Sequence, residues 1–250
     1  MKTGFFVLGP AGSGKTTCCI EVFKMKNFNK ERFKIINLDP SNNYWKNLDI
    51  IDIRKLIKLE DVIKELSLGP NGGLIFCIEY LIDNMNWLED QINLSNERIL
   101  FFDLPGQIEL FSHQTLIRDL SSHLNHVCNV SVTVLYFLDS QFLGDTSKFI
   151  GGSLTGLCCM LSTECGHRNF LTKIDLIKNL PVKILDRYNF PSMEHLNRDL
   201  SNFSNHGFRK LNQSILQLLE DFSMLYYETL DSSSIESLGE FLKSILTFYD

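Results

Sequence analysis

One segment near the start of the chain constrains its fold more than any other. Residues 9–17 read Gly-Pro-Ala-Gly-Ser-Gly-Lys-Thr-Thr and follow the strand-like run Gly4 to Leu8. The pattern Gly-x4-Gly-Lys-Ser/Thr between a strand and a helix is typical of a phosphate-binding loop, because glycines let backbone N–H groups wrap around phosphate oxygens. A chance glycine-rich turn explains these flanks poorly. The expected nucleotide contacts are Gly12, Ser13, Gly14, Lys15, Thr16 and Thr17.

The chemistry of this loop assigns roles to two side chains. Lys15 supplies positive charge to the β- and γ-phosphates, and the Thr16 hydroxyl is a candidate Mg²⁺ ligand. One class of P-loop ATPases carries an additional lysine early in the loop. Positions 10 and 11 are Pro and Ala here, which disfavours that class.

The rest of the chain alternates between short apolar runs and helical patterns. The order predicts a doubly wound, mainly parallel α/β sheet in a single domain, residues 1–250, with insertions at about 59–95 and 178–205. The predicted strands are Gly4 to Leu8, Phe33 to Leu38, Ile99 to Phe102, Val130 to Leu138, Asn169 to Leu171 and Leu225 to Glu228. The predicted helices are Lys15 to Lys26, Leu59 to Leu66, Leu74 to Gln91, Glu109 to Leu124, Ser147 to Leu161, Phe208 to Phe222 and Ile235 to Phe248.

Carboxylates follow two of the predicted strands. Asp103 begins the segment Asp-Leu-Pro-Gly-Gln-Ile-Glu, in which Gly106 is expected to turn its N–H towards the γ-phosphate. We expect Asp103 to hold magnesium through water, and Gln107 or Glu109 to position the attacking water. Asp39 precedes a proline at another strand end, where it is a candidate for orienting water or Mg²⁺. An Asp-Pro turn without chemistry remains the alternative for Asp39.

Base selection is expected in Thr-Lys-Ile-Asp, residues 172–175, after another predicted strand. The Asp175 carboxylate can accept hydrogen bonds from the ring N–H and amine of guanine, while the Lys173 stem packs on the base. Adenine cannot satisfy that acceptor in the same way, so the contact favours GTP over ATP. The familiar guanine motif begins with Asn, whereas Thr172 stands here, and base selectivity is less certain for that reason.

The segment Gly69-Pro70-Asn71-Gly72-Gly73 reads by itself as a turn. Combined with residues 9–17, 37–40, 103–109 and 172–175, however, it resembles the GPN-loop GTPases over nearly the whole chain. Residues 69–88, with 139–140 and 148–150, most resemble the second of the three eukaryotic paralogues.

That resemblance implies a dimer, either with itself or with a paralogous GPN-loop GTPase, in which the Gly-Pro-Asn loop reaches the partner's nucleotide site. Asn71 would then lie beside the other subunit's γ-phosphate, where a neutral amide replaces an arginine finger. GTP and Mg²⁺ are the implied ligands. The resemblance further implies a cytoplasmic role, with passage to the nucleus, in assembling RNA polymerases with their subunits or assembly factors.

Charge and hydropathy exclude other classes. The net charge of −6 provides no basic stripe for direct nucleic-acid binding, and no apolar run is long enough for a membrane span. Two alternatives to a GTPase stay open. A phosphotransferase would need an arginine-rich lid, and the sequence has no arginine cluster; a GTP-dependent interaction scaffold with little hydrolysis would bind nucleotide without releasing phosphate.

Overall fold

The structure is a computed structural model that describes residues 1–25, 33–45, 48–112, 115–177, 193–203 and 208–247. Within them, seven strands form one sheet in the order β3-β2-β4-β1-β5-β6-β7, and every neighbouring pair is parallel. The strands are β1 (Lys2–Leu8), β2 (Phe33–Asn37), β3 (Ile51–Asp52), β4 (Ile99–Asp103), β5 (Val130–Asp139), β6 (Gly166–Thr172) and β7 (Glu228–Leu230). The predicted α/β fold is confirmed.

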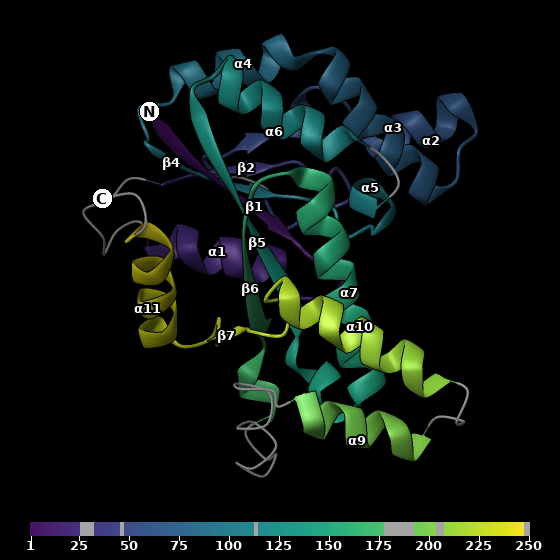
Figure 1. The fold of residues 1–250 in the computed structure, drawn as a ribbon. Coiled ribbons are helices and arrows are strands. Elements are labelled where there is room, and N and C mark those ends of the chain that lie inside the picture. Colours follow the sequence, from purple (N-terminus) through teal and green to yellow (C-terminus); the bar gives the residue numbers. More distant parts are fainter. Residues whose placement is uncertain (26–32, 46–47, 113–114, 178–192, 204–207, 248–250) are drawn as a thin grey trace.

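Helices cover both faces of this sheet (Figure 1). On one face lie α1 (Lys15–Met25) and α11 (Ile235–Leu246), and on the other lie α3 (Pro70–Asp83), α4 (Met85–Leu94), α6 (Leu116–His126) and α7 (Thr146–Thr163). Side chains of the central strands alternate between two apolar cores. In β1, Phe5 packs into the core under α1 and α11, whereas Phe6 packs into the core under α3 to α7. Burial on both faces explains the nearly continuous apolar strands of the sequence.

Two strand predictions were inaccurate. The sequence pattern missed β3, because two residues are too few to show any periodicity. The last strand was placed at Leu225 to Glu228, but its hydrogen-bonded register with β6 runs from Glu228 to Leu230. Leu225 and Tyr227 are apolar and buried because they pack into the core before the strand begins.

Two predicted helices are each interrupted. Leu74 to Gln91 was predicted as one helix, but α3 ends and α4 begins around Asn84, whose φ of −121° and ψ of 40° leave helical geometry. The Asn84 amide donates to the Tyr80 carbonyl at 2.8 Å and satisfies the helix end. Apolar residues nevertheless continue at helical spacing through Leu81, Met85 and Leu88, so the pattern did not reveal the break. Glu109 to Leu124 similarly contains α5 (Glu109–Ser112) and α6.

Helices also occupy the two regions expected as insertions. Between β3 and β4 lie a short 3-10 turn (Ile53–Lys55), α2 (Leu59–Leu66), α3 and α4. Ahead of β7, α9 (Met193–Phe203) and α10 (Arg209–Asp221) pack as a pair against α7 (Figure 1). Residues 178–192 and 204–205 of the predicted insertion lie outside the described residues. So do parts of three predicted helices: Lys26, residues 113–114 and Phe248.

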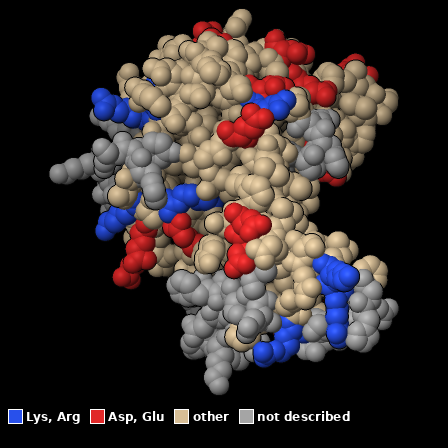
Figure 2. Space-filling view, viewed as in Figure 1, with Lys and Arg blue, Asp and Glu red and all other residues tan. Residues whose placement is uncertain are grey.

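On the face seen in Figure 2, acidic side chains predominate at the upper right of the view and basic side chains at the lower right, with both kinds between them. Across the described part of the chain, no helix is both long and apolar enough to cross a membrane.

Candidate nucleotide-binding site

The parallel register brings the carboxyl ends of β1, β2 and β4 to one edge of the sheet. The loop after β1 is built on glycines with positive φ, 142° at Gly9, 79° at Gly12 and 86° at Gly14. A Cβ on Gly9 would stand 2.2 Å from the Phe137 carbonyl oxygen on β5, so no side chain fits there. The loop therefore lies directly on the sheet, as the motif predicts for a phosphate cradle.

Lys15, the first residue of α1, is only 6% exposed. Its Nζ donates to the carbonyl oxygens of Gly9 at 2.9 Å and Pro10 at 3.0 Å, which hold the ammonium group against the loop. Burial lowers the pKa of Lys15, while the negative charges of Asp103 and Asp39 act in the opposite direction. A cation held in this position can meet phosphate oxygens bound by the loop.

Asp103 ends β4 and is fully buried. The Thr16 hydroxyl donates to its Oδ2 at 2.8 Å, which joins the two residues expected at a metal site. Burial raises the pKa of Asp103 to about 6. Asp39 lies at the rim of the same pocket, where its Oδ1 accepts from the backbone N–H and the hydroxyl of Ser41 at 2.9 and 2.6 Å.

Two residues that the sequence analysis missed complete this cluster. The Asn42 amide donates to Thr16 Oγ1 at 2.8 Å and to Asp103 Oδ2 at 3.2 Å. The Trp45 indole N–H donates to the same Oδ2 at 3.2 Å. Both side chains are buried, at 7% and 2% exposure. Their closeness to Asp39 in the chain was the only available signal, since no motif spacing marks them.

The loop after β4 contacts the phosphate cradle. A Cβ on Gly106 would lie 2.8 Å from both Ala11 Cα and Lys15 Nζ, so the close approach of the backbone requires glycine. Gln107 lines the pocket beside it, whereas Glu109, exposed at the start of α5, is not among the residues that line the pocket. Of the two residues proposed to position water, the structure brings only Gln107 to the cradle.

On the other side of the cradle, Thr172 ends β6. Its hydroxyl lies 2.7 Å from the Ser13 carbonyl oxygen and 3.2 Å from that of Leu138, so it ties β6 to the phosphate loop and to β5. Lys173 follows with a positive φ of 59°, and its Nζ donates to Asp139 Oδ2 at 2.7 Å. The Lys173 stem runs past Gly14, at 3.9 Å from a Cβ built there. Thr172 is thus a brace for the loop, not a side chain lining the pocket.

Asp175 lies in the 3-10 turn Ile174–Ile177 just beyond Lys173 and is partly exposed. No hydrogen bond joins its carboxylate to another of the described residues. Both carboxylate oxygens can therefore accept from a ligand. Asp175 is not among the residues that line the pocket at the phosphate loop, so its role in base selection stays a prediction.

A pocket of about 470 Å³ lies at this edge of the sheet, and it is lined by Ala11, Gly12, Gly14, Lys15, Thr16, Thr17, Asp39, Ser41, Leu74, Gly106, Gln107 and Lys173. Among the described residues, three of the four buried side-chain atoms without a hydrogen-bond partner lie at this edge: Ser13 Oγ, Asp103 Oδ1 and Gln107 Oε1. Buried polar atoms are rarely left unpaired, so their concentration here indicates a polar ligand. A hydroxyl and carboxylates are hard oxygen donors, and they fit Mg²⁺.

The Gly-Pro-Asn segment is the start of a helix and not a free turn. Gly69 is the N-cap of α3, and Pro70, Asn71, Gly72 and Gly73 form its first turn. Proline suits this position because its missing N–H would be unpaired there in any case. The Asn71 side chain is exposed, while Leu74, one turn further along, lines the nucleotide pocket.

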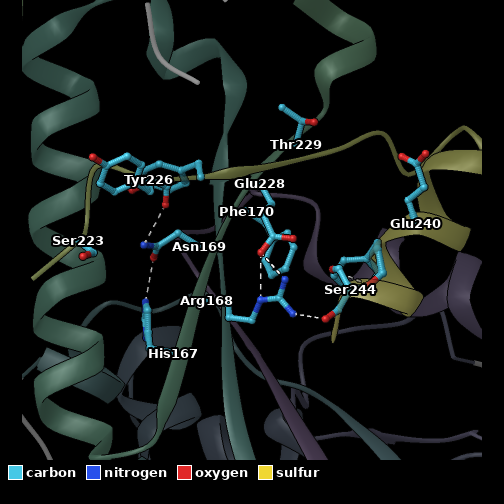
Figure 3. Close-up of a pocket in the computed structure, with 12 residues that line it drawn as sticks. His167, Arg168, Asn169, Phe170, Ser223, Tyr226, Glu228, Thr229, Glu240 and Ser244 are labelled. Carbon is cyan, nitrogen blue, oxygen red and sulfur yellow. Dashed lines mark hydrogen bonds and ion pairs between the residues drawn. The ribbon is translucent and has the colours of Figure 1, made fainter. Parts of the chain in front are cut away.

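A second pocket, of about 620 Å³, lies at the corner of β6, β7 and α11 (Figure 3). Its polar groups bind one another: Arg168 pairs with Glu228 and donates to the Ser244 carbonyl at 2.6 Å, and His167 contacts Asn169 at 2.9 Å. The Arg168 contacts join β6 to β7 and to α11. We therefore interpret this pocket as a structural feature of the fold and not as a ligand-binding site.

The parallel sheet and the phosphate loop beside a buried aspartate define a P-loop nucleoside-triphosphate-binding protein. The family model described as "Conserved hypothetical ATP binding protein" matches residues 7–250. GPN-loop GTPase 3 of Kluyveromyces lactis is 39% identical over 98% of this chain and 90% of its own length, and that of Saccharomyces cerevisiae is 39% identical over 100% and 91%. The chain belongs to the GPN-loop GTPase family.

A further relative agrees with this membership, and a solved structure agrees with the fold. GPN-loop GTPase 3 of Dictyostelium discoideum is 39% identical over 96% of this chain and 84% of its own length. A GTPase in apo form from Pyrococcus abyssi, at 21% identity, shares the fold with a TM-score of 0.80 over 99% of this chain and 97% of its own. The family prediction is confirmed. The relatives described carry the number three in their names, whereas the sequence analysis favoured the second paralogue.

Proposed function

We propose that this protein binds and hydrolyses GTP with Mg²⁺ and acts as a dimeric switch. The observation that carries the proposal is the cluster of unpartnered buried atoms Ser13 Oγ, Asp103 Oδ1 and Gln107 Oε1 around the phosphate loop and Lys15. Membership of a family of GTPases supports GTP as the nucleotide, although the description of the family model names ATP.

The chemistry asks little covalent work of the protein, so positioning and electrostatics supply the catalysis. Lys15 and the loop amides would hold the phosphates, and the Gly106 backbone lies against Ala11 and Lys15, where its N–H is proposed to meet the γ-phosphate. Thr16 and Asp103, with Asp39 at the rim, would hold magnesium, which neutralises charge on the β- and γ-phosphates. Gln107 is the side chain best placed to orient water, because its Oε1 is buried at the pocket without a partner.

Guanine selection rests on Lys173 and Asp175. The Lys173 stem lies beside Gly14 and its Nζ donates to Asp139, and the apolar part of the stem is proposed to pack on the base. The free Asp175 carboxylate accepts the two donors that guanine presents and adenine lacks. If a bound base covers this carboxylate, a base that leaves it unpaired is rejected strongly.

The dimer is proposed from the family resemblance and from Asn71. This side chain is exposed at the first turn of α3, where a second subunit can reach it. The proposed partner is either a second copy of this chain or a paralogous GPN-loop GTPase. A cytoplasmic role in RNA polymerase assembly, with passage to the nucleus and with polymerase subunits or assembly factors as partners, is proposed on the resemblance alone.

Phosphate release by the purified protein, measured with GTP and with ATP at several protein concentrations, tests the activity. We expect release from GTP only, with Mg²⁺, and activity per chain that rises with concentration as dimers form. Equal use of ATP would overturn the guanine assignment. GTP binding without release would favour the interaction scaffold.

A mixing experiment tests whether Asn71 acts across the dimer. Asn71→Ala is expected to keep GTP affinity and to lose about 100-fold in hydrolysis, the lower end of the usual effect of removing one transition-state donor. Lys15→Ala lacks a working phosphate site but keeps its own Asn71. If Asn71 acts in trans, a mixture of the two inactive variants recovers activity; if it acts in its own subunit, the mixture stays inactive.

A further inference from the structure

Asn42 and Trp45 lie in the segment after β2 and reach Asp103 from 61 and 58 residues away in the sequence. Neither belongs to a phosphate, magnesium or guanine motif. Both nevertheless bond the buried carboxylate that the proposed function assigns to magnesium. Each of the two side chains offers a neutral hydrogen-bond donor to Asp103.

The hydrogen-bond network fixes how the Asn42 amide is turned. Its Oδ1 accepts from the Tyr44 backbone N–H at 3.0 Å, so its Nδ2 must face Thr16 and Asp103. An amide turned the other way would place two acceptors together and leave the Tyr44 N–H facing a donor. Asn42 therefore approaches the site as a donor only.

The Trp45 indole provides a rigid second donor. The side chain is 2% exposed and packs in the core under α1 and α11, so its N–H has little freedom to turn away from Asp103. This packing also anchors the segment that carries Asp39 and Asn42. The donors thus have independent supports: a backbone turn for Asn42 and the apolar core for Trp45.

All three donors to Asp103 contact the same oxygen. Thr16, Asn42 and Trp45 contact Oδ2 at 2.8, 3.2 and 3.2 Å, whereas Oδ1 has no partner among the described residues. Three donors on one oxygen fix the rotation of the carboxylate. They leave the full acceptor capacity of the other oxygen for a ligand.

We propose that Asn42 and Trp45 are positioning residues of the magnesium site, holding Asp103 by Oδ2 so that Oδ1 is presented to the water shell of the ion. This inference rests on the proposed function, since it assumes that magnesium binds beside Thr16. It adds two residues to the site and assigns the segment 39–45 a second task besides carrying Asp39. Outer partners of this kind commonly change metal affinity by about 10- to 100-fold.

The test measures how much Mg²⁺ is needed for tight binding of mant-GTP, a fluorescent GTP analogue. The proteins are the native chain, Asn42→Ala and Trp45→Phe, with Asn43→Ala as matched control because its exposed amide contacts Arg54 and not Asp103. We expect the half-saturating Mg²⁺ concentration to rise about tenfold in Asn42→Ala. It should rise about fivefold in Trp45→Phe, which keeps one aromatic ring in the core and loses the pyrrole ring with its N–H, and stay unchanged in the control.

Nucleotide binding in EDTA separates positioning from general damage. We expect all four proteins to bind mant-GTP equally without magnesium, because the phosphate loop is untouched; a merely structural role would weaken binding there too. If Asn42→Ala is too unstable to purify, Trp45→Phe carries the test. Unchanged magnesium dependence in the variants, or tighter magnesium binding, overturns this inference. A native chain that binds mant-GTP equally with and without Mg²⁺ overturns the proposed magnesium site itself.

Discussion

The phosphate side and the base side of the pocket are built differently. On the phosphate side, Lys15, Thr16 and Asp103 are tied by several short hydrogen bonds, and Lys15 and Asp103 are nearly or fully buried. On the base side, Lys173 and Asp175 are partly exposed, and the Asp175 carboxylate has no partner among the described residues. The difference teaches that the side chains proposed to meet phosphate and magnesium are held in place by the fold, whereas those proposed to select the base are held by fewer contacts.

The largest effect is expected from the organised side. Lys15→Ala removes the buried cation that faces the phosphates, and GTP hydrolysis should fall about 1,000-fold, as for loss of a strong preorganised donor. Single-turnover hydrolysis measures it. Lys24→Ala, an exposed lysine on the same helix, serves as control and should leave the rate unchanged. A loss below tenfold would mean that the loop amides alone hold the phosphates and that Lys15 is dispensable.

A smaller and more selective effect is expected on the base side. Asp175→Asn removes the acceptor for guanine while leaving the phosphate loop intact, so the Kd for GTP should rise about 100-fold and that for ATP should barely change. Calorimetry with both nucleotides gives the ratio, and Asp90→Asn, exposed on α4, is the control. Equal weakening of GTP and ATP would show that Asp175 supports the pocket without reading the base.

Acid is expected to lower the free energy of unfolding through His167, which lies on β6, the strand that leads to Lys173 and Asp175. Burial lowers the pKa of His167, on β6, to about 4 from an ordinary 6.5. The unfolded chain therefore binds the proton first as pH falls below 6.5, and the folded state loses up to about 2 kcal/mol between pH 7 and 5.

Asp103 affects stability in the same pH range but in the opposite direction, because its raised pKa makes the folded state bind a proton first and acid then stabilises the fold. A variant of His167 is therefore needed to separate the two effects. The measured quantity is the difference in unfolding free energy between the native chain and His167→Gln at several pH values. It should shrink on acidification. A constant difference would show that His167 does not titrate with an altered pKa.

The smallest effect is expected at the joint between the two sides. Thr172→Val keeps the shape of the side chain but removes the hydroxyl that contacts the Ser13 carbonyl, at a cost of about 1–2 kcal/mol in unfolding free energy. Urea denaturation measures it, with Thr229→Val on the exposed edge strand as control. Weaker binding of both nucleotides would accompany the loss, since the brace supports the loop. A change in the ratio of GTP to ATP affinity would instead place Thr172 in base recognition.

The sequence predicted this site unevenly, for physical reasons. The loop at Gly12 to Thr16 and the carboxylate of Asp103 follow from local spacing, because both sit where a strand ends, and strand ends can be recognised from apolar runs. Asn42 and Trp45 could not be predicted, because their partners lie tens of residues away and are set by tertiary packing. The sequence pattern also missed the break at Asn84. Apolar periodicity shows which face of a helix is buried, and the same face stays buried before and after this break.

The register in which β4 pairs with its neighbours sets both the packing of the two cores and the position of Asp103. Asp103 stands opposite Val7 on β1 and Asn37 on β2, while Phe101 and Phe102 enter opposite cores. A slip of one residue would exchange the two phenylalanines between cores and carry Asp103 away from Thr16. A chain with a misaligned β4 is thus both poorly packed and chemically inert. Chaperones that recognise exposed apolar surface would therefore also select the molecules that cannot bind nucleotide.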